Sequence, residues 1–236
     1  MSRPKPYHST VLSVLGAMQA QRVLDAPCGD GWLGRALQAQ PGAARPDGLG
    51  LWEFPGPHDG YGAVGEHDLD EPLAAPQQPY DAVVCCEAIH LVTNPGVLLH
   101  SFKRQLRPGG RVVISTPNTW YTRSRLQFFL RGFHSGFAPM VGKRRGDYIT
   151  YFPFSFPQLH LLLTHCGFED VRIHEVDERK PKRAIEHLLA LPGRMYCAGR
   201  LRRAADEHER QYWRQAGGRQ AQHGRWLVVS AARPAA

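Results

Sequence analysis

Residues 23–34 read VLDAPCGDGWLG, and this stretch decides the fold. The apolar run that ends at Asp25 is typical of a short buried strand. Gly29 and Gly31 then favour a tight turn in which the backbone can approach a ligand closely. The residues after the turn predict a helix over 32–40, whose first N–H groups are free to bind an anion. A strand, a glycine turn and a helix in this order are typical of an α/β sheet that binds a ligand at the turn.

Two kinds of ligand suit this turn. Gly29, Gly31 and Gly34 match the G-x-G-x-x-G pattern of dinucleotide-binding proteins. Asp25, four residues before Gly29, favours a different ligand, because a carboxylate there would lie badly beside a pyrophosphate. It suits the ammonium group of an amino-acid moiety, either directly or through water. S-adenosylmethionine (SAM) carries such a moiety and no phosphate.

The rest of the chain alternates strand and helix patterns. Strands are predicted over 22–26, 48–52, 63–67, 80–86, 111–115, 168–176 and 226–231, and helices over 11–18, 32–40, 95–106 and 156–166. This alternation predicts an α/β fold with a doubly wound, mostly parallel seven-stranded sheet, Rossmann-like, and helices on both faces. Residues 55–62 are too rich in Pro and Gly for an ordinary helix, and Pro108-Gly109-Gly110 predicts a break before the fifth strand. We expect one domain over residues 1–236.

Composition narrows the class of protein. The chain has 236 residues, 42% of them hydrophobic, and a formal net charge of +8, which favours an anionic partner. Its five cysteines form no C-x-x-C pair, so we expect no structural disulfide, no metal and a cytoplasmic location. No apolar run approaches the roughly 18 residues of a membrane span. The basic N-terminus and the apolar run over 11–18 resemble a short signal peptide, but cleavage near Ala20 would leave a strand almost at the new terminus, so a helix is favoured.

Four motifs, in order and spacing, resemble the class I SAM-dependent methyltransferase family. The first is D-x-x-C-G-x-G, here Asp25 to Gly31, and the second is an acid after the third strand, Asp68 in HDL. The third is YDAVVCCEAIH over 80–90, and the fourth is LRPGGRVVISTPN over 106–118. The resemblance implies a methyltransferase of small molecules with SAM as its cofactor.

The same resemblance implies roles for individual residues. The turn residues would border the amino-acid end of SAM: Asp25, Pro27, Gly29, Asp30 and Gly31. Asp68 would accept a hydrogen bond from the adenine amino group, with the Leu69 N–H facing the ring, although Asp68 would also suit a turn or helix cap. Cys86 and Glu87 would line the cleft beside the sulfonium.

One position departs from the family pattern. The family places an acid at the end of the second strand, where it bridges the two ribose hydroxyls, and this chain has Gly50 there. Glu53 or Asp30 could supply the missing carboxylate. If neither does, weak or altered SAM binding and a pseudoenzyme are alternatives that stay open.

The acceptor side is expected after the fourth and fifth strands. His90 is the candidate general base for an alcohol acceptor, and a packed or capping histidine is the alternative. Residues 117–154 would form a lid over the acceptor, with candidate contacts from Asn118, Trp120, Tyr121, Arg123 and Arg125. The P-N…S-R-L…F-x-L-x-G stretch resembles bacterial methyltransferases that act on sugars, lipid-linked glycans or related small acceptors, which implies O-methylation of a small or glycan-type acceptor, neutral or anionic. The alternative for the lid is an amphipathic helix with about half of its aromatic residues in the core.

Other interpretations stay open at this point. An RNA methyltransferase would use the arginines and aromatics, but no appended RNA-binding motif and no N-P-P-Y tetrapeptide is present, so no stable nucleic-acid partner is expected. An NAD-dependent oxidoreductase would use the glycine pattern, with Glu53 22 residues past Gly31. A non-catalytic SAM-binding module would explain Gly50. For the Arg-rich insertion over 177–224, a solvated helix with a flexible tail is favoured over a binding role.

Overall fold

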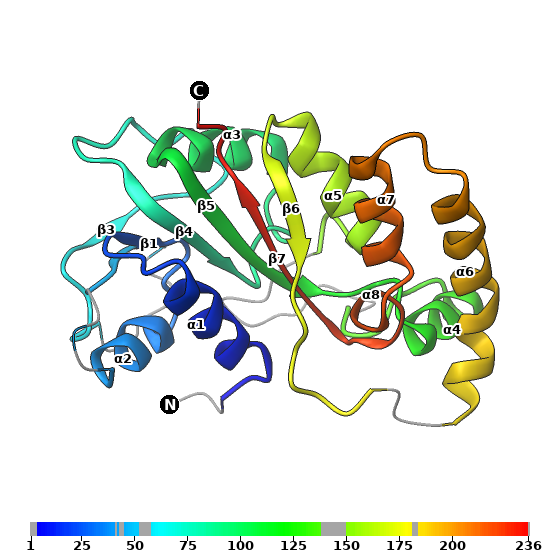
Figure 1. The fold of residues 1–236 in the computed structure, drawn as a ribbon. Coiled ribbons are helices and arrows are strands. Elements are labelled where there is room, and N and C mark those ends of the chain that lie inside the picture. The colour runs from blue at the N-terminus through cyan, green and yellow to red at the C-terminus, as the bar shows by residue number, and fades with distance from the viewer. Residues whose placement is uncertain are drawn as a thin grey trace.

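The computed structural model describes residues 4–40, 42, 45–51, 58–137, 150–180 and 184–235. Within these residues one seven-stranded sheet has the order β3-β2-β1-β4-β5-β7-β6 (Figure 1). Described neighbours pair in parallel except β7, which is antiparallel to β5 and β6. The mostly parallel, doubly wound sheet is therefore confirmed. The strands are β1 (Val23–Asp25), β2 (Asp47–Gly50), β3 (Val64–Glu66), β4 (Tyr80–Cys86), β5 (Leu106–Pro117), β6 (Glu169–Ile173) and β7 (Trp226–Ala232).

Helices cover both faces of the sheet (Figure 1). One apolar cluster joins α1 and α2 to the sheet, and the other joins α3 and α5 to its opposite face. Strand β4 contributes to both clusters, because alternate side chains point to opposite faces: Ala82, Val84 and Cys86 to one, Val83 and Cys85 to the other. The helices are α1 (Tyr7–Ala17), α2 (Trp32–Gln38), α3 (Pro95–Gln105), α4 (Thr122–Arg131), α5 (Phe156–His165), α6 (Ile185–Arg202), α7 (Glu207–Ala216) and α8 (Arg219–His223).

Sequence signals fix the helices that pack on the sheet. Asn94 caps α3 by accepting a hydrogen bond from the Val97 N–H at 3.2 Å, with proline in the first turn. Ser155 and Gln158 form a reciprocal capping box at the start of α5. The chain then places Leu98, Leu99 and Phe102 of α3 in the core. These helices begin where the capping and proline signals predict.

Two sequence predictions differ from the structure. The Pro108-Gly109-Gly110 stretch does not break the chain before the fifth strand, because β5 runs through it from Leu106 to Pro117. At this stretch the pairing of β5 with β4 shifts its register between Tyr80 and Ala82. The insertion over 177–224 is not one helix with a flexible tail. It forms α6, α7 and α8 between β6 and β7, and buries Cys197, Ala216 and Ala221.

The order of the strands identifies where a ligand can bind. From β1 the chain moves outward to β2 and β3 and then returns to β4 on the other side of β1. In open α/β sheets, such a switch point opens a crevice at the carboxyl ends of the strands. None of the helices in the described ranges is long and apolar enough to cross a membrane.

Candidate cofactor and acceptor site

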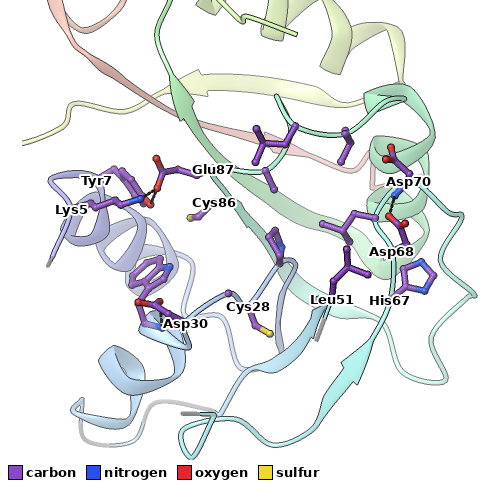
Figure 2. Close-up of a pocket in the computed structure, with 18 of the residues that line it drawn as sticks. Lys5, Tyr7, Cys28, Asp30, Leu51, His67, Asp68, Asp70, Cys86 and Glu87 are labelled. Atoms are coloured by element: carbon purple, nitrogen blue, oxygen red, sulfur yellow. Dashed lines mark hydrogen bonds and ion pairs between the residues drawn. The ribbon is translucent and has the colours of Figure 1, made fainter. Parts of the chain in front are cut away.

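A cavity of about 600 Å³ opens at the carboxyl ends of β1, β2 and β4, which is a usual volume for a small-molecule site (Figure 2). Its wall includes residues of the glycine turn, the residues after β3 and β4, and the N-terminal segment. These four segments, which lie far apart in the sequence, therefore meet at the switch point. The cavity is lined by Lys5, Tyr7, His8, Pro27, Cys28, Gly29, Asp30, Trp32, Gly50, Leu51, His67, Asp68, Leu69, Asp70, Cys86, Glu87, Ala88, Leu91, Val92 and Tyr151.

The glycine turn adopts the conformation that its sequence favours. Gly29 and Gly31 have φ of +49° and +75°, in the left-handed region that favours glycine. Gly31 precedes the first residue of α2, so the turn leads directly into a helix N-terminus. Pro27, Gly29 and Asp30 line the cavity as predicted residues of this turn, whereas Gly31 is buried behind them.

Asp25 lies beneath the turn rather than in the cavity wall. It is fully buried, and Tyr61 donates a hydrogen bond to its Oδ2 at 2.5 Å. Burial raises the pKa of Asp25 to about 7. Its other oxygen, Oδ1, has no hydrogen-bond partner among the described residues. Tyr61 was not predicted, because it belongs to a Pro/Gly-rich stretch that gave no structural signal.

One end of the cavity carries a cluster of charged and polar groups (Figure 2). Lys5 forms an ion pair with Glu87, and the Tyr7 hydroxyl donates to Glu87 Oε2 at 2.8 Å. Glu87 has φ of +55°, an uncommon conformation for a residue with a side chain, and it directs the carboxylate to the N-terminal segment. His8 stacks on Trp32, with ring centroids 3.8 Å apart. Sequence reasoning selected Glu87 but missed Lys5, Tyr7 and His8.

The opposite end is formed by the segment after β3 (Figure 2). The backbone N–H of Asp70 donates to Asp68 Oδ1 at 3.0 Å, so Asp68 has the local turn contact that was its alternative role. Its side chain still lines the cavity, as does the buried Leu69. Asp70 is held in place by the Thr93 hydroxyl, which donates to it at 2.8 Å.

At the end of β2, where the family has a ribose-binding acid, this chain has Gly50. Gly50 lines the cavity next to Leu51. Glu53 lies outside the described residues. Asp30, the other candidate, lines the cavity and accepts a hydrogen bond from the Trp32 N–H at 3.3 Å. His58, which was not predicted, places Nε2 3.2 Å from the Gly29 carbonyl oxygen.

His90 is buried and is not in the cavity wall, although Ala88 and Leu91 beside it in the chain are. Its Nδ1 lies 3.1 Å from Thr116 Oγ1, and burial lowers the pKa of the imidazole to about 4. The His90 carbonyl accepts a hydrogen bond at 3.0 Å from the N–H of Tyr151, which does line the cavity. The ring is therefore neutral at pH 7, and the backbone of His90 is bonded to a residue of the cavity wall.

The five candidate acceptor residues lie away from the cavity wall. Asn118 is fully buried, and its Nδ2 donates to the carbonyls of Ala221 and Gly224 at 2.9 and 2.8 Å. It joins β5 to α8. The others are Trp120, packed on the core, Tyr121, buried, Arg123, exposed, and Arg125, which donates to the Leu189 carbonyl at 3.5 Å. Within the predicted lid segment, the cavity is lined by Tyr151 instead.

The cavity fits SAM in polarity as well as size. SAM has a zwitterionic amino acid at one end and adenine at the other. Lys5 and Glu87 offer opposite charges at one end of the cavity, Asp68 offers an acceptor at the other, and apolar side chains lie between (Figure 2). Asp25 Oδ1, buried without a described partner, adds an acceptor under the turn. No described cluster of His, Cys, Asp or Glu has the makeup of a metal site.

Comparisons with known proteins agree with this geometry. A sequence model described as a methyltransferase domain matches residues 5–173. The ubiquinone biosynthesis O-methyltransferase of Xylella fastidiosa (strain M23) is 32% identical over 118 residues, which cover 48% of this chain and 46% of that protein. The enzyme of the same name from Dechloromonas aromatica is 29% identical over 113 residues, or 43% of this chain and 47% of that protein. The matched segment thus spans about half the length of these relatives.

Solved structures share the fold across nearly the whole chain. A SAM-dependent methyltransferase from Mesorhizobium loti has a TM-score of 0.54 at 19% identity and covers 97% of this chain and 98% of that one. Human N-acetylserotonin methyltransferase in complex with SAM has a TM-score of 0.53 at 13% identity and covers 97% of this chain and 52% of that one. The matching domain, the strand order and the cavity agree, and the chain belongs to the class I SAM-dependent methyltransferase family.

Proposed function

We propose that this methyltransferase transfers the methyl group of SAM to a hydroxyl oxygen of a small-molecule acceptor. The observation that supports this proposal is a neutral imidazole, His90, whose carbonyl accepts a hydrogen bond from Tyr151 of the cavity wall. A hydroxyl must lose its proton during methylation, and a neutral imidazole can take one. The names of the relatives, ubiquinone biosynthesis O-methyltransferases, support oxygen as the methylated atom.

The cofactor would be held along the cavity. Lys5 and Tyr7 would bind the carboxylate of SAM, Glu87 and the buried Asp25 would favour its ammonium group, and Asp68 with the Leu69 N–H would meet the adenine. Pro27, Gly29, Asp30, Gly31 and Cys86 would shape the wall between the two ends. Asp30 is the carboxylate that we assign to the ribose side in place of Gly50, because it lines the cavity. When bound, SAM supplies an activated methyl group.

The chain then has to position the acceptor and take its proton. Tyr151 would contact the acceptor from the lid segment over 117–154, and its backbone is tied to His90. If Nδ1 of His90 carries the ring proton, it donates a hydrogen bond to Thr116 Oγ1. Nε2 is then the atom that takes the proton from the hydroxyl of the acceptor molecule. Glu87 is less suited to this task, since its carboxylate already pairs with Lys5 and accepts a hydrogen bond from Tyr7.

We also propose a charge for the acceptor, a cellular location for the protein and a single-domain organisation. The net charge of +8 favours an acceptor that carries a negative group, whether it is a small aromatic molecule or a glycan. A cytoplasmic location is supported by the five cysteines, all within the described residues and all free. Residues 1–236 would act as one domain, with 177–224 as an insertion between its last two strands.

Formation of S-adenosylhomocysteine in the presence of candidate acceptors tests this proposal. The panel should contain catechols, phenols and carboxylated phenols, uronic and neutral sugars, primary amines and an oligoribonucleotide. We expect turnover with a hydroxyl acceptor, and a loss of roughly 10²–10⁴-fold in kcat for His90→Asn with unchanged affinity for S-adenosylhomocysteine. Arg225→Gln, an exposed residue that contacts Trp226 and lies outside the cavity wall, is the matched control. Transfer only to amines or to RNA, or full activity of His90→Asn, would contradict the proposal.

A further inference from the structure

Helix α4 carries its large apolar side chains on the side that faces water. Leu126, Phe129 and Leu130 are exposed, with 85% of Phe129 and 71% of Leu130 accessible to solvent. Phe133, just after the helix, continues the same 3–4 spacing and is also exposed. The residues that α4 buries are the small polar Thr122 and Ser124. The apolar stripe of α4 therefore contacts solvent rather than the core.

Helix α6 repeats this inverted arrangement. Its exposed apolar residues follow helical spacing over nearly the whole helix: Ile185, Leu188, Leu189, Met195 and Tyr196. Leu188 is 64% exposed and Met195 is 71% exposed. The side that α6 buries contains Glu186, Ala190 and Cys197. Two helices from different parts of the chain thus present apolar stripes to water.

The two helices lie side by side at one end of the molecule (Figure 1). The Arg125 guanidinium of α4 donates to the Leu189 carbonyl of α6 at 3.5 Å. Gly193 of α6 faces the same guanidinium, because a Cβ there would lie 3.4 Å from Arg125 Nη1. We name the exposed side of these helices, with Phe133, the α4/α6 surface. Apolar patches of this kind on a folded protein mark an interaction site.

The charged residues of helices α4 and α6 themselves are almost all positive. Helix α4 contains three arginines and no acidic residue, and Arg123 and Arg131 are exposed. Helix α6 exposes Arg194 and Arg202, and its one acidic residue, Glu186, is buried. Apolar stripes flanked by arginine are the pattern of helices that lie in the interface of an anionic membrane. A symmetric contact with a second copy is disfavoured, because it would bring this basic surface against itself.

We propose that the α4/α6 surface docks on an anionic lipid bilayer, with its apolar side chains in the headgroup region and its arginines on the lipid phosphates. The docked surface would lie on the acceptor side. Ring contacts lead inward from α4: Phe128 stacks on His134, His134 contacts Phe137, and Phe137 contacts His90. Docking would bring an acceptor dissolved in the bilayer close to the cavity. The docking itself does not depend on which atom is methylated.

Co-sedimentation of the full chain with lipid vesicles tests docking. The probes are vesicles of phosphatidylcholine alone and of phosphatidylcholine with 30% phosphatidylglycerol. We expect binding to the anionic vesicles, weaker binding to the neutral ones, and a marked decrease at high salt. The double variant Phe129→Ser with Met195→Ser should bind the anionic vesicles about tenfold or more weakly, because two large apolar side chains no longer enter the lipid.

Leu161→Ser is the matched control, because Leu161 is a 70% exposed apolar residue on α5, outside the α4/α6 surface. It should bind vesicles as the unchanged chain does. All three proteins should have the same melting temperature, since the substituted side chains are exposed. Absence of vesicle binding, or equal binding by the double variant, would overturn the proposal. So would a dimer in sedimentation equilibrium that the double variant dissociates, because the surface would then be a contact between copies.

Discussion

Helices α3 and α4 precede and follow β5 in the chain and have similar lengths, yet α3 buries its large apolar side chains and α4 exposes them. Helix α3 buries Leu98, Leu99 and Phe102, whereas α4 buries Thr122 and Ser124 and leaves Phe129 in water. Both have amphipathic sequences. Helical periodicity determines which residues share a face, but the packing of neighbouring elements decides whether that face meets the core or the solvent.

The difference separates two regions of the molecule. Around the cavity, helices α1 to α3 place their apolar residues against the sheet, and charged groups such as Lys5 and Glu87 are left to face the ligand site. At the other end, α4 and α6 keep apolar residues available to a partner. The first region would bind the cofactor beside a packed core, and the second exposes an apolar surface.

The largest expected effect compares two phenylalanines. Phe102→Ala should lower the free energy of unfolding by about 3–5 kcal/mol, because it leaves a void in a fully buried site. Phe129→Ala should change it by less than about 0.5 kcal/mol, because that side chain is exposed. Urea unfolding measures both. Similar losses would mean that α4 also packs into a core, and the contrast between the two helices would fail.

A buried carboxylate gives the cavity region a pH dependence. The pKa of Asp25 is raised to about 7 by burial, above its value of roughly 4 in an unfolded chain. The folded state therefore binds the proton more tightly, and the stability that the neutral form contributes is lost as pH rises from about 4 to 7. Asp25→Asn should raise the free energy of unfolding at pH 8 by on the order of 1–3 kcal/mol and have little effect near pH 4. The free energy of unfolding of both proteins should be measured against pH without cofactor. The same pH dependence in both would show that Asp25 is not its source.

A smaller effect is expected at the charged end of the cavity. Lys5→Met should weaken binding of S-adenosylhomocysteine about tenfold, because it removes a charged hydrogen-bond donor from the proposed carboxylate site. Tyr7→Phe should have a weaker effect in the same direction. Arg131→Met, on the α4/α6 surface, serves as the control and should leave the dissociation constant unchanged. Isothermal titration calorimetry gives the dissociation constants of all three variants. Equal affinities would show that the N-terminal segment is not part of the cofactor site.

The sequence predicted those parts of the molecule that depend on local signals. The bounds of β4 agree with the prediction over residues 80–86, because a continuous apolar run ends at a defined position. The glycine turn, the second and third strands and the start of α3 follow from short patterns as well. Of the predicted cofactor residues, Pro27, Gly29, Asp30, Asp68, Leu69, Cys86 and Glu87 share the cavity wall. Their roles in binding remain predictions.

The remaining features depend on contacts between distant residues. Tyr7 donates a hydrogen bond to Glu87, which is 80 positions away in the chain. Asn118 donates hydrogen bonds to the carbonyls of Ala221 and Gly224, more than 100 positions away. No local pattern shows that Asn118 will be buried or that Tyr7 will enter the cavity. The Pro-Gly-Gly stretch before residue 111 predicted a break, but pairing with β4 on one side and β7 on the other carries the strand through it.

Calorimetric titration of the chain and of its Gly50→Leu variant with S-adenosylhomocysteine tests the location of the cofactor most directly. Gly50 lines the cavity, and a Cβ there would have only ordinary contacts with Cys28 and Pro27, so the variant should fold while its side chain fills the cavity. We predict one binding site in the unchanged chain, no response to NAD, and binding at least tenfold weaker in the variant. Equal affinity in both proteins, or binding of NAD in place of S-adenosylhomocysteine, would contradict the account.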